Sequence, residues 1–84
     1  MVYYLIMCRS LTYAQRINSA LERSGIEATV IRSPASISPA GCGYSVQVGE
    51  RRLSQALSVL NREGLVHQGV FVGTPEQGYR EVDF

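Results

Sequence analysis

Lysine is absent from the sequence, and all eight basic residues are arginines. Seven acidic residues oppose them, which leaves a formal net charge of +1 at pH 7. Apart from the pair Arg51-Arg52 the arginines are dispersed, so the chain lacks the basic patch that nucleic-acid binding requires. The five tyrosines are also scattered and form no stacking platform for single-stranded RNA. We therefore expect no nucleic-acid partner.

Cysteine and histidine are scarce. The two cysteines, Cys8 and Cys42, lie far apart, and no signal-peptide pattern precedes them. This is not the disulfide framework of a small secreted protein, so we expect a cytoplasmic domain. A single histidine, His67, with two distant cysteines is too small a set for a zinc site. We expect no bound metal and no cofactor.

Long hydrophobic runs are also missing. The apolar run over residues 2–8 ends at Arg9, which makes it too short for a membrane span or a signal peptide. We expect no membrane association and interpret this run as a buried central strand. A hydrophobic share of 45% with 18% charged residues is typical of a folded globular domain.

Hydrophobic periodicity predicts the order strand, helix, strand, strand, helix, strand. The predicted strands cover residues 2–8, 27–32, 44–48 and 68–73. Ser10 is the expected N-cap of the first helix, Gly25 its stop residue, and the second helix extends from Gly49 to Gly64. The buried stripe of the second helix is expected at Leu53, Ala56, Leu57 and Leu60.

This order predicts an α+β, ferredoxin-like βαββαβ fold. Its four-stranded antiparallel sheet has both helices on one face and places strands 2–8 and 44–48 side by side in the middle. We expect residues 1–73 to form the domain. Residues 74–84 contain Pro75 and Gly78 and show no sustained period, so we expect a C-terminal tail or flap.

The connection between the second and third strands ends in Gly41-Cys42-Gly43. Glycine on both sides of a cysteine allows a substrate or partner atom to approach the sulfur closely, which is typical of a reactive thiol. The alternative is that the glycines only permit a bend and Cys42 packs as a small apolar residue.

The predicted topology brings a group of chemically active residues to one end of the sheet: Cys42, Cys8, Arg9, Ser10, Arg32 and His67. The N-terminus of a helix attracts anions, and together with Arg9 or Arg32 it would lower the pKa of Cys42 and favour the thiolate. Cys8 is either a buried core cysteine or a second thiol for Cys42. The alternative interpretation of both arginines and of His67 is a solvated surface position.

Several segments resemble the small bacterial thiol domains of the selenium/sulfur carrier protein-like family, a group of domains of unknown function. These segments are Tyr3-Tyr4-Leu5-Ile6-Met7 followed by Arg9-Ser10, then Arg32-Ser33-Pro34, and Ile37-Ser38 leading to Cys42-Gly43-Tyr44-Ser45-Val46. The resemblance covers roughly residues 2–72, and the Cys-Gly segment is its specific part. The chain departs from the family pattern at Gly41 and at Tyr44, where leucine or isoleucine is usual.

The resemblance implies that Cys42 carries sulfur or selenium as a persulfide or selenopersulfide. A cysteine desulfurase-type donor would supply the atom, and an unknown acceptor protein would receive it. Backbone N–H groups of Gly43 and Tyr44, with Arg9 and Ser10 nearby, would stabilise the anion. Such a protein is a carrier or a sulfurtransferase-like subunit rather than a turnover enzyme.

Two other functions remain open at this point. One is a non-catalytic protein-interaction or ligand-sensing module, a common use of ferredoxin-like domains. The other is a thiol metal chaperone that uses Cys42 with Cys8, although the paired-cysteine spacing of soft-metal carriers is missing. A homodimer through the sheet face left uncovered by the helices is also consistent with the apolar residues expected there.

Overall fold

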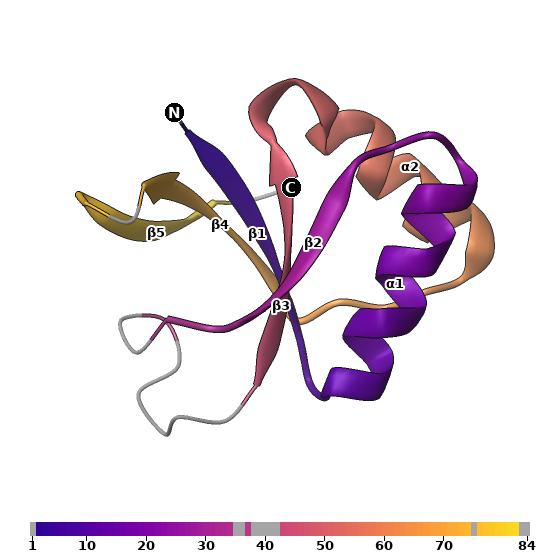
Figure 1. Cartoon of the computed structure of the whole chain (residues 1–84), viewed down its shortest axis with the longest axis horizontal. Helices are drawn as coiled ribbons and strands as arrows, with labels where there is room; N and C mark the ends of the chain where they lie inside the picture. The colour runs from indigo at the N-terminus through magenta and orange to yellow at the C-terminus, as the bar shows by residue number, and fades with distance from the viewer. Residues whose placement is uncertain (1, 35–36, 38–42, 75, 83–84) are drawn as a thin grey trace.

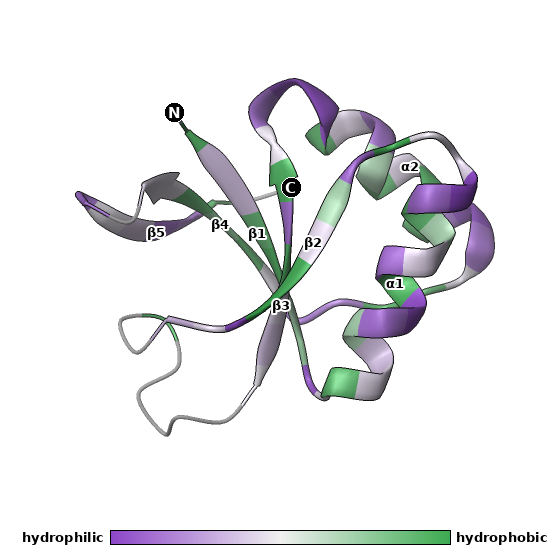
Figure 2. Cartoon of the chain, viewed as in Figure 1, coloured by the Kyte–Doolittle hydropathy of each residue, from purple (hydrophilic) through white to green (hydrophobic). Residues whose placement is uncertain are grey.

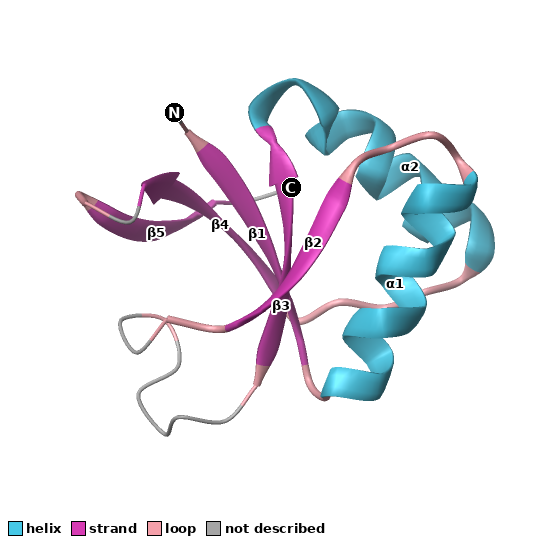
Figure 3. Ribbon diagram, in the orientation of Figure 1, coloured by secondary structure: helices cyan, strands magenta, loops and turns pink. Residues whose placement is uncertain are grey.

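The computed structural model describes residues 2–34, 37, 43–74 and 76–82 (Figure 1). In this part of the chain two helices lie on the same side of an antiparallel sheet, which confirms the predicted α+β class (Figure 3). The strands are β1 (Tyr3–Cys8), β2 (Ala28–Arg32), β3 (Tyr44–Gly49), β4 (Gly69–Thr74) and β5 (Gly78–Val82). The helices are α1 (Leu11–Arg23) and α2 (Leu53–Glu63), and a short 3-10 turn, η1 (Glu50–Arg52), precedes α2.

Local sequence signals set the ends of both helices. The Ser10 side chain accepts a hydrogen bond from the backbone N–H of Tyr13 at 3.1 Å, so it caps the start of α1 as predicted. Gly25, just beyond α1, and Gly64, at the end of α2, have φ angles of 79° and 69°. These left-handed angles suit glycine because it has no Cβ, and they confirm both predicted stops.

The strands lie in the order β2-β3-β1-β4-β5. β1 is antiparallel to both of its neighbours, with Ile6 opposite Val46 on β3 and opposite Val70 on β4. The predicted pairing of the first and third strands is therefore confirmed. Because β1 is paired on both sides, its last residue, Cys8, is fixed at a defined edge of the sheet.

The predicted number of strands is wrong, because the sheet has five strands and not four. The fifth strand, β5, comes from the segment expected to be a tail, and the sheet departs in this respect from the four-stranded ferredoxin-like description. Gly78 follows the turn with a φ of 83°, and the Thr74 hydroxyl accepts a hydrogen bond from the N–H of Gln77 at 3.0 Å. Main-chain pairing with β4 therefore defines this edge strand, with little help from apolar periodicity.

The hydrophobic core lies between the helices and the sheet. Hydrophobic and hydrophilic residues alternate around each helix, so that one side of each packs on the strands (Figure 2). On α2 the buried residues are Leu53, Ala56, Val59 and Leu60. Leu57, predicted in the buried stripe, is only half-buried at the margin of the core, and Val59 takes its place. Neither helix, within the described part of the chain, has the length and apolar character needed to span a bilayer.

Candidate functional site

The candidate site lies at the edge of the sheet where β1 ends and β3 begins. Cys8 pairs with Tyr44 across β1 and β3, and Arg32 pairs with Tyr44 across β2 and β3. Arg9 and Ser10 directly follow β1 and lead into α1. The topology thus brings these predicted site residues together at one end of the domain.

The segment before β4 approaches the same edge. The backbone N–H of Gln68 donates a hydrogen bond to the carbonyl oxygen of Met7 at 2.9 Å, which places the neighbouring His67 beside the end of β1. His67 therefore joins the group as the predicted topology requires. Cys42 and Gly41 lie outside the described residues, and the structure gives the surroundings of Cys42 only from Gly43 onward.

Gly43 has a φ of 111°, an angle that side-chain-bearing residues rarely adopt. Its carbonyl oxygen accepts a hydrogen bond from the N–H of Ser33 at 3.2 Å. The residue that follows Cys42 is thus fixed to the exit of β2 in a conformation that favours glycine. The positive φ angle of Gly43 therefore accounts for a glycine directly after the cysteine.

Two buried serines, which the sequence did not indicate as part of the site, form a hydrogen bond between the end of β2 and the start of β3. The hydroxyl oxygens of Ser33 and Ser45 are 2.8 Å apart, and these residues are only 6% and 0% exposed. A buried hydroxyl needs a partner, and each of these supplies one to the other. In the alternating sequence of β3, Ser45 falls on the face away from the helices. From the sequence alone, a polar residue on that face is expected to be exposed to solvent, so the pattern did not indicate that Ser45 is buried.

Cys8 has the properties of a core cysteine, which is the first of its two predicted interpretations. The residue is 1% exposed, and its Sγ donates a weak hydrogen bond to the carbonyl oxygen of Ile6 at 3.5 Å. Burial raises the pKa of the Cys8 thiol to about 11, because the thiolate would lose its hydration. Cys8 is therefore a neutral thiol at physiological pH and a poor nucleophile.

Arg9 is held in place by an aromatic ring. Its guanidinium carbon lies 5.4 Å from the centroid of the Tyr13 ring, within the range of a cation–π interaction. The Tyr13 hydroxyl in turn accepts a hydrogen bond from the backbone N–H of Val66. This chain of contacts joins the first turn of α1 to the segment that precedes β4.

A small cavity of about 300 Å³ lies at this junction, and the residues that line it are Arg9, Tyr13, Val66, His67 and Gln68. None of the five is acidic. Burial lowers the pKa of His67, so its imidazole is neutral at pH 7 and Arg9 supplies the positive charge. Neither Arg9 nor Arg32 forms an ion pair with an acidic residue of the described part of the chain. The site edge is therefore positively polarised.

Metal ligands do not gather in this region. Among residues 2–34, 37, 43–74 and 76–82, no group of three or more His, Cys, Asp or Glu side chains is close enough to hold an ion. The observed geometry instead combines the Arg9 cation, the N-terminus of α1 and Gly43, which directly precedes β3. This combination can stabilise an anion presented between Gly43 and α1.

Comparison with protein families gives one match. The sequence model described as "Putative Se/S carrier protein-like" matches residues 3–72. This range includes both cysteines, both helices and β1 to β3, together with most of β4. A comparison with curated proteins gives no match.

Proposed function

Because this match covers most of its length, the chain belongs to the Se/S carrier protein-like family, and we propose that it carries sulfur or selenium on Cys42. The family match is the observation that carries this proposal. In the proposed cycle a cysteine desulfurase-type donor loads Cys42 in the cytoplasm, and an acceptor protein removes the atom.

The choice of Cys42 is supported by the state of the other cysteine. The sequence contains two cysteines, and Cys8 is buried with a pKa raised to about 11. A thiol in that state neither meets a donor protein nor ionises readily. Cys42 precedes Gly43, whose φ of 111° and hydrogen bond to Ser33 define where the strand begins.

The transfer is a thiol exchange that needs no external oxidant. The Cys42 thiolate attacks the terminal sulfur of the donor persulfide and forms a new S–S bond. The S–S bond of the donor breaks, and its electron pair stays on the donor cysteine as a thiolate. Cys42 then holds the persulfide, and a thiolate of the acceptor removes the terminal sulfur in the same way. Selenium would follow the same path as a selenopersulfide.

The charge environment supports the thiolate form of Cys42. Arg9 directly follows Cys8, which pairs with Tyr44 at the start of β3, and α1 begins two residues after Arg9. A cation and a helix N-terminus both favour an anion nearby. We expect a Cys42 pKa below the usual value of about 8.5. Measuring the rate of iodoacetamide alkylation against pH gives this pKa directly. The substitution Arg9→Gln should raise it, whereas Arg80→Gln on β5 should not.

Intact-mass spectrometry tests the function. The protein is incubated with a cysteine desulfurase and cysteine, or with selenocysteine and a selenocysteine-processing enzyme. We expect the wild type and Cys8→Ser to gain one sulfur or selenium atom, and Cys42→Ser to gain none. If the wild type gains no atom while the desulfurase is active, the carrier function is wrong and the domain is a non-catalytic interaction or ligand-sensing module. Copper or zinc retained through purification would instead indicate a thiol metal chaperone.

A further inference from the structure

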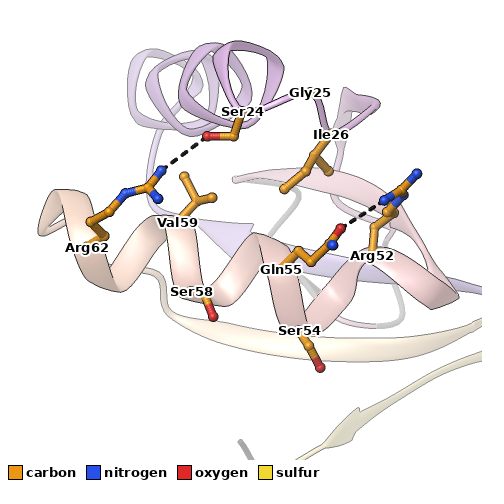
Figure 4. A pocket seen from close by; sticks show the side chains of 9 residues that line it. All are labelled: Ser24, Gly25, Ile26, Arg52, Ser54, Gln55, Ser58, Val59 and Arg62. Carbon is orange, nitrogen blue, oxygen red and sulfur yellow. Dashed lines mark hydrogen bonds between the residues drawn. The ribbon is translucent and has the colours of Figure 1, made fainter.

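A groove of about 440 Å³ separates α2 from the turn that joins α1 to β2 (Figure 4). Its lining includes Ser24, Gly25 and Ile26 on one side, and residues of η1 and α2 on the other. None of the lining residues belongs to the candidate site around Gly43. The groove is therefore a separate surface of the protein.

One stripe of side chains on η1 and α2 faces the α1–β2 turn. Arg52, Gln55, Val59 and Arg62 follow one another at helical spacing and point toward the α1–β2 turn (Figure 4). Arg52 and Arg62 stand at the two ends of the stripe. Between them Val59 and Ile26, which are 5% and 3% exposed, provide an apolar floor. The groove thus has a hydrophobic centre and a basic group at each end.

Neither arginine is neutralised within the described part of the chain. Arg62 donates to the hydroxyl of Ser24 at 3.3 Å, and Arg52 donates to the side-chain oxygen of Gln55 at 2.9 Å. Both acceptors are uncharged, and none of the residues that line the groove is acidic. Glu27 lines an adjoining cavity with Arg52 but does not form an ion pair with it. Each guanidinium has five N–H donors, so most of its hydrogen-bonding capacity remains unused.

We infer that this groove binds an extended acidic segment of a partner protein. The guanidinium group matches a carboxylate with two parallel hydrogen bonds, and this geometry makes arginine the preferred residue for such recognition. Ten residues of helix place the two arginines about 15 Å apart along the axis. An extended chain advances about 3.3 Å per residue, so acidic residues four or five positions apart reach both arginines.

A nucleic acid fits these observations less well than a peptide. The whole chain has a net charge of +1, which gives little of the electrostatic attraction that binding to a phosphate backbone requires. The two separated cations, Arg52 and Arg62, favour a segment that carries acidic side chains four or five positions apart. This inference uses only residues of the α1–β2 turn, η1 and α2, so it does not depend on whether Cys42 carries a chalcogen.

The experiment is an NMR titration of the ¹⁵N-labelled full chain. The probe is an N-acetylated, C-amidated hexaglutamate peptide, and hexaglutamine is the neutral control. We expect hexaglutamate to shift the backbone resonances of Ser24 to Ile26 and of α2, and hexaglutamine to leave them unchanged. A dT12 oligonucleotide is titrated in parallel to compare a nucleic acid with the peptide.

Matched variants with the same change in charge locate the binding site. R52Q/R62Q removes both cations of the groove, and R16Q/R80Q removes two exposed arginines elsewhere. Because an exposed ion pair contributes up to about fivefold in affinity, we expect R52Q/R62Q to weaken hexaglutamate binding about tenfold or more. The affinity of R16Q/R80Q for hexaglutamate should stay within about twofold of the wild-type value, because salt screens the attraction of charges that lie far from the groove. Circular dichroism confirms that both variants fold.

Three results would overturn the inference. The first is the absence of shifts at millimolar hexaglutamate. The second is an equal loss of affinity in both double variants, which would indicate a general charge effect. The third is tighter binding of dT12 than of hexaglutamate in the same groove, which would assign the surface to nucleic acid. Each of these results leaves the mass-spectrometric test of Cys42 unaffected.

Discussion

At the level of single residues, the buried pair Ser33 and Ser45 connects the fold to the candidate site. Each hydroxyl has the other as its partner, and the backbone of Ser33 also holds Gly43. The pair therefore sets the position from which the cysteine-bearing connection begins. It could not be predicted from the sequence, because its burial depends on which strands become neighbours.

The first prediction concerns this pair. Ser45→Ala leaves the buried Ser33 hydroxyl without its partner and should lower the free energy of unfolding by about 1–3 kcal/mol. The double variant S33A/S45A removes both polar groups and should lose less than the sum of the two single losses. Urea unfolding followed by circular dichroism measures Ser33→Ala, Ser45→Ala and the double variant. Strictly additive losses would show that the two hydroxyls do not depend on each other.

The second prediction concerns pH and Cys8. Burial raises the pKa of this thiol from about 9 to about 11, so in this range the native state keeps a proton that the unfolded chain releases. The contribution of the protonated Cys8 thiol to the free energy of unfolding is fully present below about pH 9 and decreases as the pH rises toward 11. The loss approaches about 2 kcal/mol in the free energy of unfolding.

Cys8→Ala provides the control, because tyrosines also titrate in this range. The difference in unfolding free energy between wild type and C8A, measured by urea titration at several pH values, isolates the contribution of the thiol. We expect this difference to shrink between pH 9 and pH 11. A difference that is constant over this range would contradict a raised Cys8 pKa.

At the level of elements, sequence patterns predicted the helices and the central strands well. Ser10, Gly25 and Gly64 mark helix ends through local chemistry, which does not depend on the rest of the fold. β1 is apolar on both faces and β3 alternates between apolar and polar residues, which are the patterns of strands packed on a core. The edge strand β5 lacks such a pattern, since main-chain pairing with β4 is enough to define it.

The third prediction tests the β4–β5 hairpin. A Cβ added at Gly73 would lie 2.0 Å from the carbonyl oxygen of Gly78, a contact with backbone that cannot be relieved by a side-chain rotation. Gly73→Ala should therefore separate β5 from β4 and lower the unfolding free energy by about 1–3 kcal/mol. Hydrogen exchange of the β5 amides, together with urea unfolding, measures both effects.

Gly49→Ala is the matched control for this substitution. Gly49 has a φ of −67°, and no atom lies within 4 Å of an added Cβ. The change should be neutral or slightly stabilising, because alanine restricts the unfolded chain. Protected β5 amides in Gly73→Ala, or equal losses of stability in both variants, would contradict the close approach of the two strands.

At the level of the whole molecule, the sheet has one face covered by helices and one face without them (Figure 1). On the helix-free face Leu5 is fully buried by its neighbours, and Met7 and Phe71 are half-buried. The alternation of β1 predicted apolar residues on both faces. It could not predict how completely Leu5 is covered, because that depends on side chains from neighbouring strands.

The fourth prediction follows from this second face. We propose that two copies associate through it, because pairing would cover Met7 and Phe71. Sedimentation velocity should then show a concentration-dependent dimer. Phe71→Glu should shift the equilibrium to monomer, whereas Val66→Glu, at an apolar residue that is 72% exposed elsewhere, should not. A monomer throughout the micromolar range would contradict this assembly.

The sealed position of Cys8 has a practical consequence for studying the protein in solution. A maleimide fluorophore, a spin label or a trifluoromethyl tag cannot reach that sulfur while the domain stays folded. Any such reporter that the native chain takes up is therefore attached to Cys42. Spectroscopy at the proposed cargo position can thus begin with the unmodified sequence, without removing a competing thiol.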